Sequence, residues 1–344
     1  PISFLGKELT LDGVDSTTRI VQAALEGDSI FIIDGGQEEI VNAIENLTIS
    51  GARAGANGGG ILLSNQSSLS VIGCTFVDNQ SGETFNGGGL CITNQSRCTV
   101  EGCLFTDNTA TGGRGGGVYV SNDSELFISG TDFIENSAAV GGGACIDRPG
   151  DCSVDRCLFA GNTAGSGGGL SIGSNDGKSA GLDAPMVVSC AFSGNTAATG
   201  GAIRLVTYDD PGDITIGGVG YVDNCTFSRN SANTSPVVRA VASIATDAII
   251  LRNCIVWRNS GALSTLFLIP DFTNCQLDEA YRKRIFETPG SSMLENVSVV
   301  DPRFIDELGP DGVAGTGDEN LRVMPGSPVI DQGTSAVGLS SADL

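Results

Sequence analysis

Carboxylates, arginines and thiols are the side chains in this sequence that could carry out chemistry, because its 344 residues include no histidine. The absence of histidine excludes Ser-His-Asp and Cys-His catalysis, histidine-ligated zinc and any histidine acid or base. The chain has 40 Asp and Glu residues against 18 Lys and Arg residues, which gives a net charge of −22. This acidic balance argues against nucleic acid as a partner, and no apolar run is long enough for a membrane-spanning helix.

Acidic side chains gather in two stretches, residues 173–185 and 207–218. As loops on one face, they could bind a ligand, a partner or a cation, or bring two carboxylates together; the simpler interpretation is two solvated acidic loops. The candidate binding residues are Asp176, Asp183, Tyr208, Asp209, Asp210 and Asp213. A polysaccharide lyase or hydrolase would draw on Asp209, Asp210, Asp223 and Arg204, but no spacing selects them.

A third acidic segment, residues 311–320, is rich in glycine. Calcium needs several oxygen ligands from carboxylates and carbonyls, and glycines let the backbone curl to supply them. The spacing is not that of an EF-hand. We expect a structural Ca²⁺ held by Asp311, Asp318, Glu319 and Asn320, and an ordinary exposed turn is the alternative.

Eleven cysteines leave disulfides, metal binding and buried thiols as alternatives. Cys91 and Cys98 lie in one repeat, and Cys145 and Cys152 recur with the same spacing in the next repeat but one. Because the extra cysteines occur in pairs, we expect the disulfides Cys91–Cys98 and Cys145–Cys152 in an oxidising compartment. The argument against them is that Leu126, at the place of Cys98 in the intervening repeat, indicates a position that faces inward.

Two linked motifs repeat along the chain and must position all of these residues. One is Phe-x-x-Asn, and the other is a glycine cluster before an apolar residue. A cysteine usually lies two residues before the phenylalanine, and Thr131 takes that place in the third copy. The phenylalanines are Phe76, Phe105, Phe133, Phe159, Phe192 and Phe227.

Each copy contains short β-type runs separated by turn residues, and these runs are too short to be helices. One copy cannot bury its own apolar face, so the copies must stack. The sequence therefore predicts an all-β fold, a right-handed parallel β-helix with one coil per repeat and a rise of about 4.8 Å per coil. The phenylalanines, cysteines and asparagines should each form a ladder along the rod. Of these, we expect the cysteine ladder to be buried thiols.

The number of residues between the glycine cluster and the cysteine position is constant through four copies and then increases in two successive ones. These insertions are the stretches 173–185 and 207–218, and stacking should place them side by side on one face.

Residues 277–287 form a short helix in this prediction, an excursion on the surface that carries the basic cluster Arg282 to Arg284. We divide the chain into N-terminal coils at 1–57, regular repeat coils at 58–262 and irregular C-terminal coils at 263–344.

The sequence Gly-Gly-Ala-Ile at residues 200–203, together with the Phe-x-x-Asn motifs, resembles the repeats of chlamydial polymorphic outer-membrane proteins. More broadly, the chain resembles pectin-lyase-like right-handed β-helix proteins of bacterial surfaces. Residues 301–304 (Asp-Pro-Arg-Phe) and 321–333 are similar to the end segment of β-helix proteins with a variable downstream anchor. The resemblance implies an extracellular or cell-surface location, and we expect the chain to be part of a longer precursor.

The function we expect is a non-catalytic structural or adhesive role at a bacterial surface or in a matrix. Two alternatives remain: a module that binds a carbohydrate or another partner on the inserted-loop face, and a polysaccharide lyase or hydrolase. The expected partners are a surface glycan or a second copy of the chain. A head-to-tail fibre is one form of self-association, because a parallel β-helix ends in unpaired strand edges.

Overall fold

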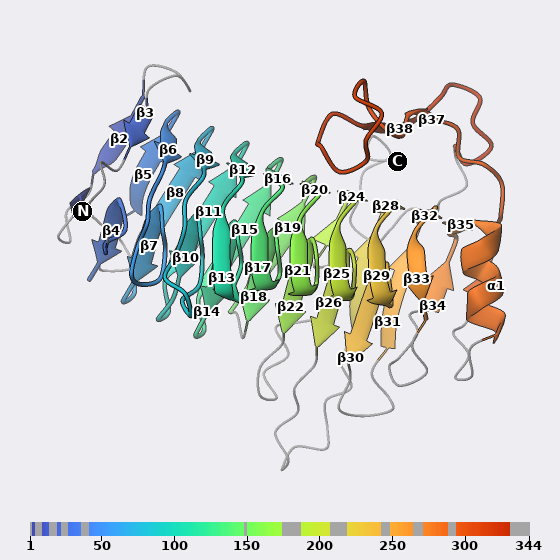
Figure 1. Cartoon of the computed structure of the whole chain (residues 1–344), viewed down its shortest axis with the longest axis horizontal. Helices are drawn as coiled ribbons and strands as arrows, with labels where there is room; N and C mark the ends of the chain where they lie inside the picture. The colour runs from blue at the N-terminus through green and yellow to red at the C-terminus, as the bar shows by residue number, and fades with distance from the viewer. Residues whose placement is uncertain are drawn as a thin grey trace, which may run out of the picture.

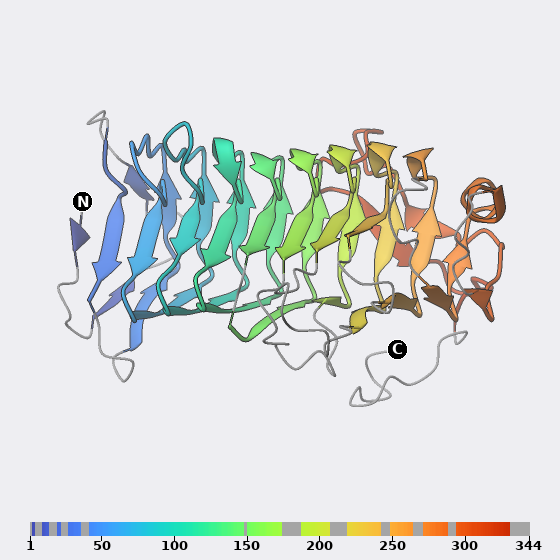
Figure 2. The same ribbon diagram turned by 90° about the horizontal axis from the view of Figure 1, so that it is seen from below.

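Short parallel strands stack along one axis to form a rod (Figure 1), and the view from below shows the same stack (Figure 2). This computed structural model describes residues 2–3, 9–13, 19–21, 27–35, 41–147, 150–173, 187–206, 219–241, 248–263, 271–287 and 294–330. Every strand pair within the coils is parallel, and equivalent strands of successive coils are neighbours in the same sheet. The prediction of a parallel β-helix is confirmed.

Four sheets form the walls of the rod. Successive coils contribute strands to sheets A, B and C in turn, and six of the coils add a strand to sheet D. Sheet A contains β1 (Ile2–Ser3), β4 (Phe31–Asp34), β7 (Ile61–Ser64), β10 (Leu90–Ile92), β14 (Val118–Ser121), β18 (Ala144–Asp147), β22 (Leu170–Gly173), β26 (Ile203–Val206) and β30 (Val238–Val241). Sheet B contains β2 (Thr10–Asp12), β5 (Val41–Glu45), β8 (Ser68–Ile72), β11 (Arg97–Glu101), β15 (Glu125–Ser129), β19 (Cys152–Asp155), β23 (Val187–Val188), β27 (Val219–Asp223), β31 (Ala248–Arg252), β34 (Asp271–Thr273) and β36 (Leu294–Glu295).

The other two walls continue each coil. Sheet C contains β3 (Arg19–Val21), β6 (Thr48–Ser50), β9 (Thr75–Val77), β12 (Leu104–Thr106), β16 (Asp132–Ile134), β20 (Leu158–Ala160), β24 (Ala191–Ser193), β28 (Thr226–Ser228), β32 (Ile255–Trp257) and β35 (Gln276–Leu277). Sheet D contains β13 (Thr109–Arg114), β17 (Ser137–Val140), β21 (Thr163–Ser166), β25 (Thr196–Thr199), β29 (Ser231–Thr234) and β33 (Ser260–Ala262). An antiparallel pair, β37 (Phe304–Asp306) and β38 (Asn320–Val323), lies outside the walls.

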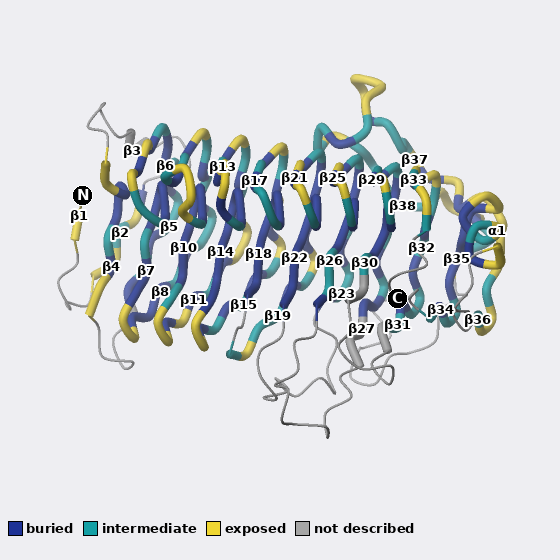
Figure 3. Tube along the Cα trace, turned by 60° about the horizontal axis from the view of Figure 1, so that its bottom comes forward, coloured by how far each residue is buried: buried dark blue, intermediate teal, exposed yellow. Residues whose placement is uncertain are grey.

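The core lies inside the coils, and Figure 3 shows buried residues at equivalent places in successive coils along the rod. The phenylalanines of the repeat lie in register in sheet C and are all fully buried. From Phe76 to Phe227 their rings stack with centroids 4.4–5.1 Å apart and planes within 12° of parallel. This spacing follows the strand spacing of a parallel sheet, so one phenylalanine per coil builds a continuous aromatic column.

The glycine cluster precedes sheet A because the turn there leaves no room for side chains. Gly115 has φ +66°, and a Cβ at this position would lie 2.1 Å from the carbonyl oxygen of Val118. A Cβ on Gly117 would lie 2.7 Å from the Gly143 carbonyl oxygen and 3.0 Å from the Phe133 ring. The glycine and phenylalanine motifs therefore occur together because the ring of one packs against the bare backbone of the other.

A buried asparagine ladder follows sheet C. The backbone N–H and the Nδ2 of Asn108 both donate to Oδ1 of Asn136, at 3.0 and 2.9 Å. The same Nδ2 donates to the carbonyl oxygen of Phe76 in the preceding coil, at 2.9 Å. Equivalent bonds repeat through Asn79, Asn108, Asn136, Asn162, Asn195, Asn230 and Asn259. Each side chain satisfies the polar backbone of a buried turn in the neighbouring coil.

The cysteine ladder before sheet C also forms hydrogen bonds between neighbouring coils. The backbone N–H of Cys157 donates to Sγ of Cys190 at 3.4 Å, and the Cys190 thiol donates to the carbonyl oxygen of Val188 at 3.1 Å. Thr131 replaces a cysteine in this ladder, and its Oγ1 accepts from the N–H of Cys103 at 3.3 Å and donates to Ser129 at 3.0 Å. A hydroxyl can therefore take the place of the thiol because both groups donate and accept.

A helix covers the C-terminal end of the rod, α1 (Glu279–Glu287). Asp278 caps it by accepting the N–H of Tyr281 at 2.6 Å, and its other carboxylate oxygen accepts the N–H of Arg258 at 2.8 Å. Tyr281 is buried and packs edge-on against the ring of Phe272, with the two ring centroids 6.2 Å apart. The predicted helix is confirmed, and it lies on the surface with two side chains, Tyr281 and Ile285, packed on the last coils. Among the described residues, no helix is long and apolar enough to span a membrane.

The ladder geometry predicts opposite outcomes for two isosteric substitutions. Cys190→Thr keeps a donor and an acceptor at this position, so we expect stability close to that of the wild type. Cys190→Val leaves the N–H of Cys157 without its acceptor and should cost about 1–3 kcal/mol more. Urea unfolding of the two variants measures the difference, and equal stability would show that the thiol acts only as a small apolar group.

Candidate functional site

The two predicted insertions leave and re-enter the rod at the same corner. One joins β22 to β23 and the other joins β26 to β27. The strands on both sides are in register, with Gly173 paired to Val206 and Val187 paired to Val222. The six predicted binding residues in these insertions, Asp176, Asp183, Tyr208, Asp209, Asp210 and Asp213, lie outside the described residues.

The outer face of sheet A changes character at the coils that carry these insertions. In the earlier coils the outward row consists of Leu62, Cys91, Tyr119 and Cys145, which form a small apolar cluster of their own. In the next coils the same row continues as Ser171, Arg204 and Arg239. The row therefore passes from apolar to cationic along the rod.

Each of the two arginines donates a hydrogen bond to a hydroxyl group. Arg204 Nη1 donates to Ser171 Oγ at 3.0 Å, and Arg239 Nη1 donates to Thr199 Oγ1 at 2.7 Å. Burial lowers the pKa of Arg239, and the charge of Arg204 lowers it further. Arg239 was not among the predicted binding residues. Its position in the repeat was nevertheless a signal, because each outward residue lies two places after the end of the turn before sheet A.

The residues available to a lyase or hydrolase are not brought together where they are described. Asp223 points outward from sheet B and is enclosed, and it forms a bidentate pair with Arg252, at 2.8 Å from Nε and 2.6 Å from Nη2. Arg204 belongs to sheet A, on a different wall of the rod. Asp223 therefore has a structural partner, as buried carboxylates do.

The predicted disulfides Cys91–Cys98 and Cys145–Cys152 are wrong, because all four residues are free thiols. Cys91 points outward from sheet A into the cluster with Tyr119, whereas Cys98 points inward into the main core. Side chains alternate between the two faces of a strand, and here the alternation directs Cys91 of sheet A out of the rod and Cys98 of sheet B into it. Cys145 belongs to the outer cluster as well, and Cys152 packs against the main core.

These thiols are poorly suited to chemistry. Burial raises the pKa of Cys91, Cys145 and Cys152, each to about 12. In the inner ladder, burial also raises the pKa of Cys254 and Cys275. The thiolate is the nucleophile and the metal ligand, and a raised pKa keeps these five thiols protonated. Among the described residues, no group of three or more His, Cys, Asp or Glu side chains could hold a metal ion.

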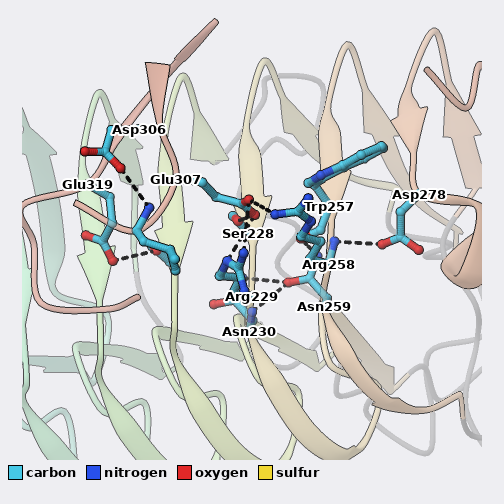
Figure 4. A network of polar contacts seen from close by, with 12 residues as sticks. Ser228, Arg229, Asn230, Trp257, Arg258, Asn259, Asp278, Asp306, Glu307 and Glu319 are labelled. Atoms are coloured by element: carbon cyan, nitrogen blue, oxygen red, sulfur yellow. Dashed lines mark hydrogen bonds and ion pairs between the residues drawn. The ribbon is translucent and has the colours of Figure 1, made fainter. Parts of the chain in front are cut away.

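The C-terminal segment from 301 to 330 folds back along the rod and is held by carboxylates (Figure 4). Glu307 accepts from Ser228 Oγ at 2.8 Å, from Arg229 Nη2 at 3.2 Å and from Arg258 Nη1 at 2.5 Å. Glu319 accepts from Ser193 Oγ at 2.9 Å. Residues more than a hundred positions apart in the sequence thus meet on the outside of sheet C.

The four predicted calcium ligands lie in this segment, and each accepts hydrogen bonds there. Asp311 accepts from the N–H of Val313 at 2.7 Å, and Asp318 accepts from Thr316 Oγ1 at 3.0 Å. Glu319 turns toward the rod, and Asn320 accepts from the N–H of Arg322 at 3.2 Å. These bonds support the alternative of an ordinary turn, and calcium binding stays a prediction.

The Glu307 contacts predict which substitution weakens the docking of the C-terminal segment on the rod. Glu307→Gln removes the charge that two arginines share, so we expect a loss of about 1–3 kcal/mol in the docking of this segment. Amide hydrogen exchange at 304–323 should become faster. Glu287→Gln is the matched control, because Glu287 forms an exposed pair with Lys283 at 3.7 Å. Equal protection in both variants would contradict the assignment.

Comparison with known proteins identifies the family of the chain. No curated protein and no solved structure matches the chain significantly. Residues 19–307 match the family described as a right-handed β-helix region. The match covers most of the 344 residues and agrees with the parallel stacking of the strands, so the chain belongs to the right-handed β-helix family.

Proposed function

We propose that the protein is a non-catalytic structural or adhesive rod that acts outside the cell. The observation that carries this proposal is the unbroken asparagine ladder from Asn79 to Asn259, with the phenylalanine column beside it. Every coil along this length is tied to its neighbours through buried hydrogen bonds, and stacked rings add to them from Phe76 to Phe227. Such a solenoid is stiff along its axis and can vary its outer surface without disturbing the core.

The outer surface supports an adhesive role more than a catalytic one. Outward positions differ from coil to coil while the inward positions repeat, as in the row that runs from Tyr119 to Arg239. Asp223, the described carboxylate among the candidates for lyase or hydrolase chemistry, is held by Arg252. The resemblance of the repeats to bacterial surface proteins supports the extracellular location. A surface glycan is the partner class that we propose.

The C-terminal end favours single rods over a head-to-tail fibre. Tyr281 and Ile285 of α1 are buried against the last coils. A second copy that paired with the strand edges at this end would have to displace the helix and expose these side chains. The self-association that we propose is therefore secondary to binding by the individual rod.

One preparation can test adhesion against catalysis. We expect the protein to bind members of a glycan array and to release neither unsaturated sugars, which absorb in the ultraviolet, nor new reducing ends from the same glycans. Asp223→Asn, checked for folding by circular dichroism, serves as the control for activity that belongs to the chain. Turnover by the wild type that this variant loses would overturn the proposal in favour of a lyase or hydrolase.

A further inference from the structure

A polar groove runs along the corner where the chain passes from sheet A to sheet B. It crosses three successive coils at β8, β11 and β15, which are neighbours in sheet B (Figure 1). Its volume is about 450 Å³, and its lining includes Gln66, Ser68, Gln95, Arg97, Asp123 and Glu125. None of these residues belongs to the phenylalanine, asparagine or cysteine ladders of the core, so the groove needs an explanation of its own.

The lining repeats with the coils. One row comes from the turn before sheet B and consists of Gln66, Gln95 and Asp123. A second row begins the strands of sheet B in directly paired positions and consists of Ser68, Arg97 and Glu125. Because neighbouring strands of a sheet lie about 4.8 Å apart, polar side chains recur at this interval along the groove.

The amide groups of the turn hold one another in place. Gln66 Nε2 donates to Gln95 Oε1 at 3.2 Å. At the rim, Asn94 Nδ2 donates to Asn65 Oδ1 at 3.2 Å, and Asn122 Nδ2 donates to Asn94 Oδ1 at 3.3 Å. A side-chain amide has two donors and two acceptor lone pairs, so Gln66 and Gln95 retain hydrogen-bonding groups for a ligand. Order that exists before binding reduces the entropy lost on binding.

The charges inside the groove nearly cancel. Arg97 Nη1 lies 3.0 Å from Glu125 Oε2, and the Arg97 guanidinium group lies over the ring of Phe127, 5.1 Å from its centroid. Asp123 adds a further negative charge, and the whole chain has a net charge of −22. This field repels an anionic ligand. The groove therefore suits a neutral ligand rich in hydroxyl groups, which both donate and accept hydrogen bonds.

An extended peptide does not suit this surface. A peptide binds a sheet by adding a strand to a free edge. The strand β8 pairs with β5 and β11, and β15 pairs with β11 and β19, so the strands under the groove have no free edge. A ligand must therefore bind through the side chains of the groove.

We propose that the groove binds a neutral β-1,4-linked glycan that lies along the rod, with one sugar residue opposite each of the three coils. Such a glycan is an extended ribbon in which each residue advances by about 5 Å, close to the spacing of the coils. The turn row bonds the hydroxyl groups along one edge of the ribbon, and Arg97 with Glu125 bonds those along the other. The inference rests on the proposed function, since it assigns glycan binding to one groove and one class of glycan.

Calorimetric titration of the whole chain tests the groove, with cello- and manno-oligosaccharides as probes. We expect saturable binding of at least one series that strengthens from the disaccharide to the trisaccharide and changes little in the hexasaccharide, because three coils form the groove. The affinity should not depend on ionic strength, since the ligand is uncharged. Maltohexaose, whose α-linked chain curls, should bind on the order of tenfold more weakly, and hexagalacturonate should not bind.

Two variants make the test specific to the groove. Gln66→Gly/Gln95→Gly removes both amides, and glycine suits the left-handed backbone there, where φ is +60° and +59°. This variant should bind the hexasaccharide on the order of tenfold more weakly. Asp107→Gly is the matched control, because it makes the same backbone change at φ +56° in the turn after sheet C, and should leave the affinity unchanged. Circular dichroism and the melting temperature check that both variants are folded.

The outcomes separate the groove from the proposed function. Weaker binding by the glutamine variant but not by the Asp107 variant supports the groove. Equal affinity of the two variants, or no saturable binding of a neutral β-1,4-linked oligosaccharide, overturns the groove, whereas binding of other glycans on an array would still support the adhesive role. Binding of hexagalacturonate that the glutamine variant loses overturns the neutral class of ligand. Turnover of the hexasaccharide would overturn the non-catalytic function and leave the groove standing.

Discussion

The fold depends on a hydrogen bond that crosses from one coil to the next inside a buried turn. A buried turn of a solenoid contains backbone N–H and carbonyl groups that have no partner within a helix or a sheet. The asparagine after sheet C meets this need, because its side chain bonds to both neighbouring coils. Asn136 accepts from Asn108 and donates to the carbonyl oxygen of Phe105 in the preceding coil, and it donates to Asn162 in the next coil. A coil without this residue would bury unsatisfied groups at a cost of about 1–3 kcal/mol each.

The other repeated residues follow from the same register. Once the turns are stacked, the phenylalanines of sheet C are forced into a column, and the glycines before sheet A must leave room for their rings. The cysteines satisfy a second turn in the manner of the asparagines, which explains why threonine replaces one of them. The inside of the rod is thus fixed coil by coil, whereas the outside is free to vary. The arginine pair and the docked C-terminal segment both lie on the outside.

Sequence reasoning succeeded where one residue type repeats at one place in the coil. The buried ladders and the glycine turns were predicted because repetition reveals register directly. It failed where side-chain direction at a single place decides the outcome, as for Cys91, which points out of the rod, and Cys98, which points into it. It also missed contacts between distant segments. Nothing near Glu319 in the sequence indicates that it meets Ser193, and only the buried Tyr281 shows that α1 is a cap.

The most direct test of this account is amide hydrogen exchange at the asparagine ladder. The backbone N–H groups of Asn108, Asn136 and Asn162 donate to side chains of the next coil at 3.0 Å, in turns that are fully buried. The account predicts that these turn amides exchange as slowly as the amides of the core strands beside them, since opening one requires separating two coils. Exchange at rates close to those of an unstructured peptide would contradict the central role given to the ladder.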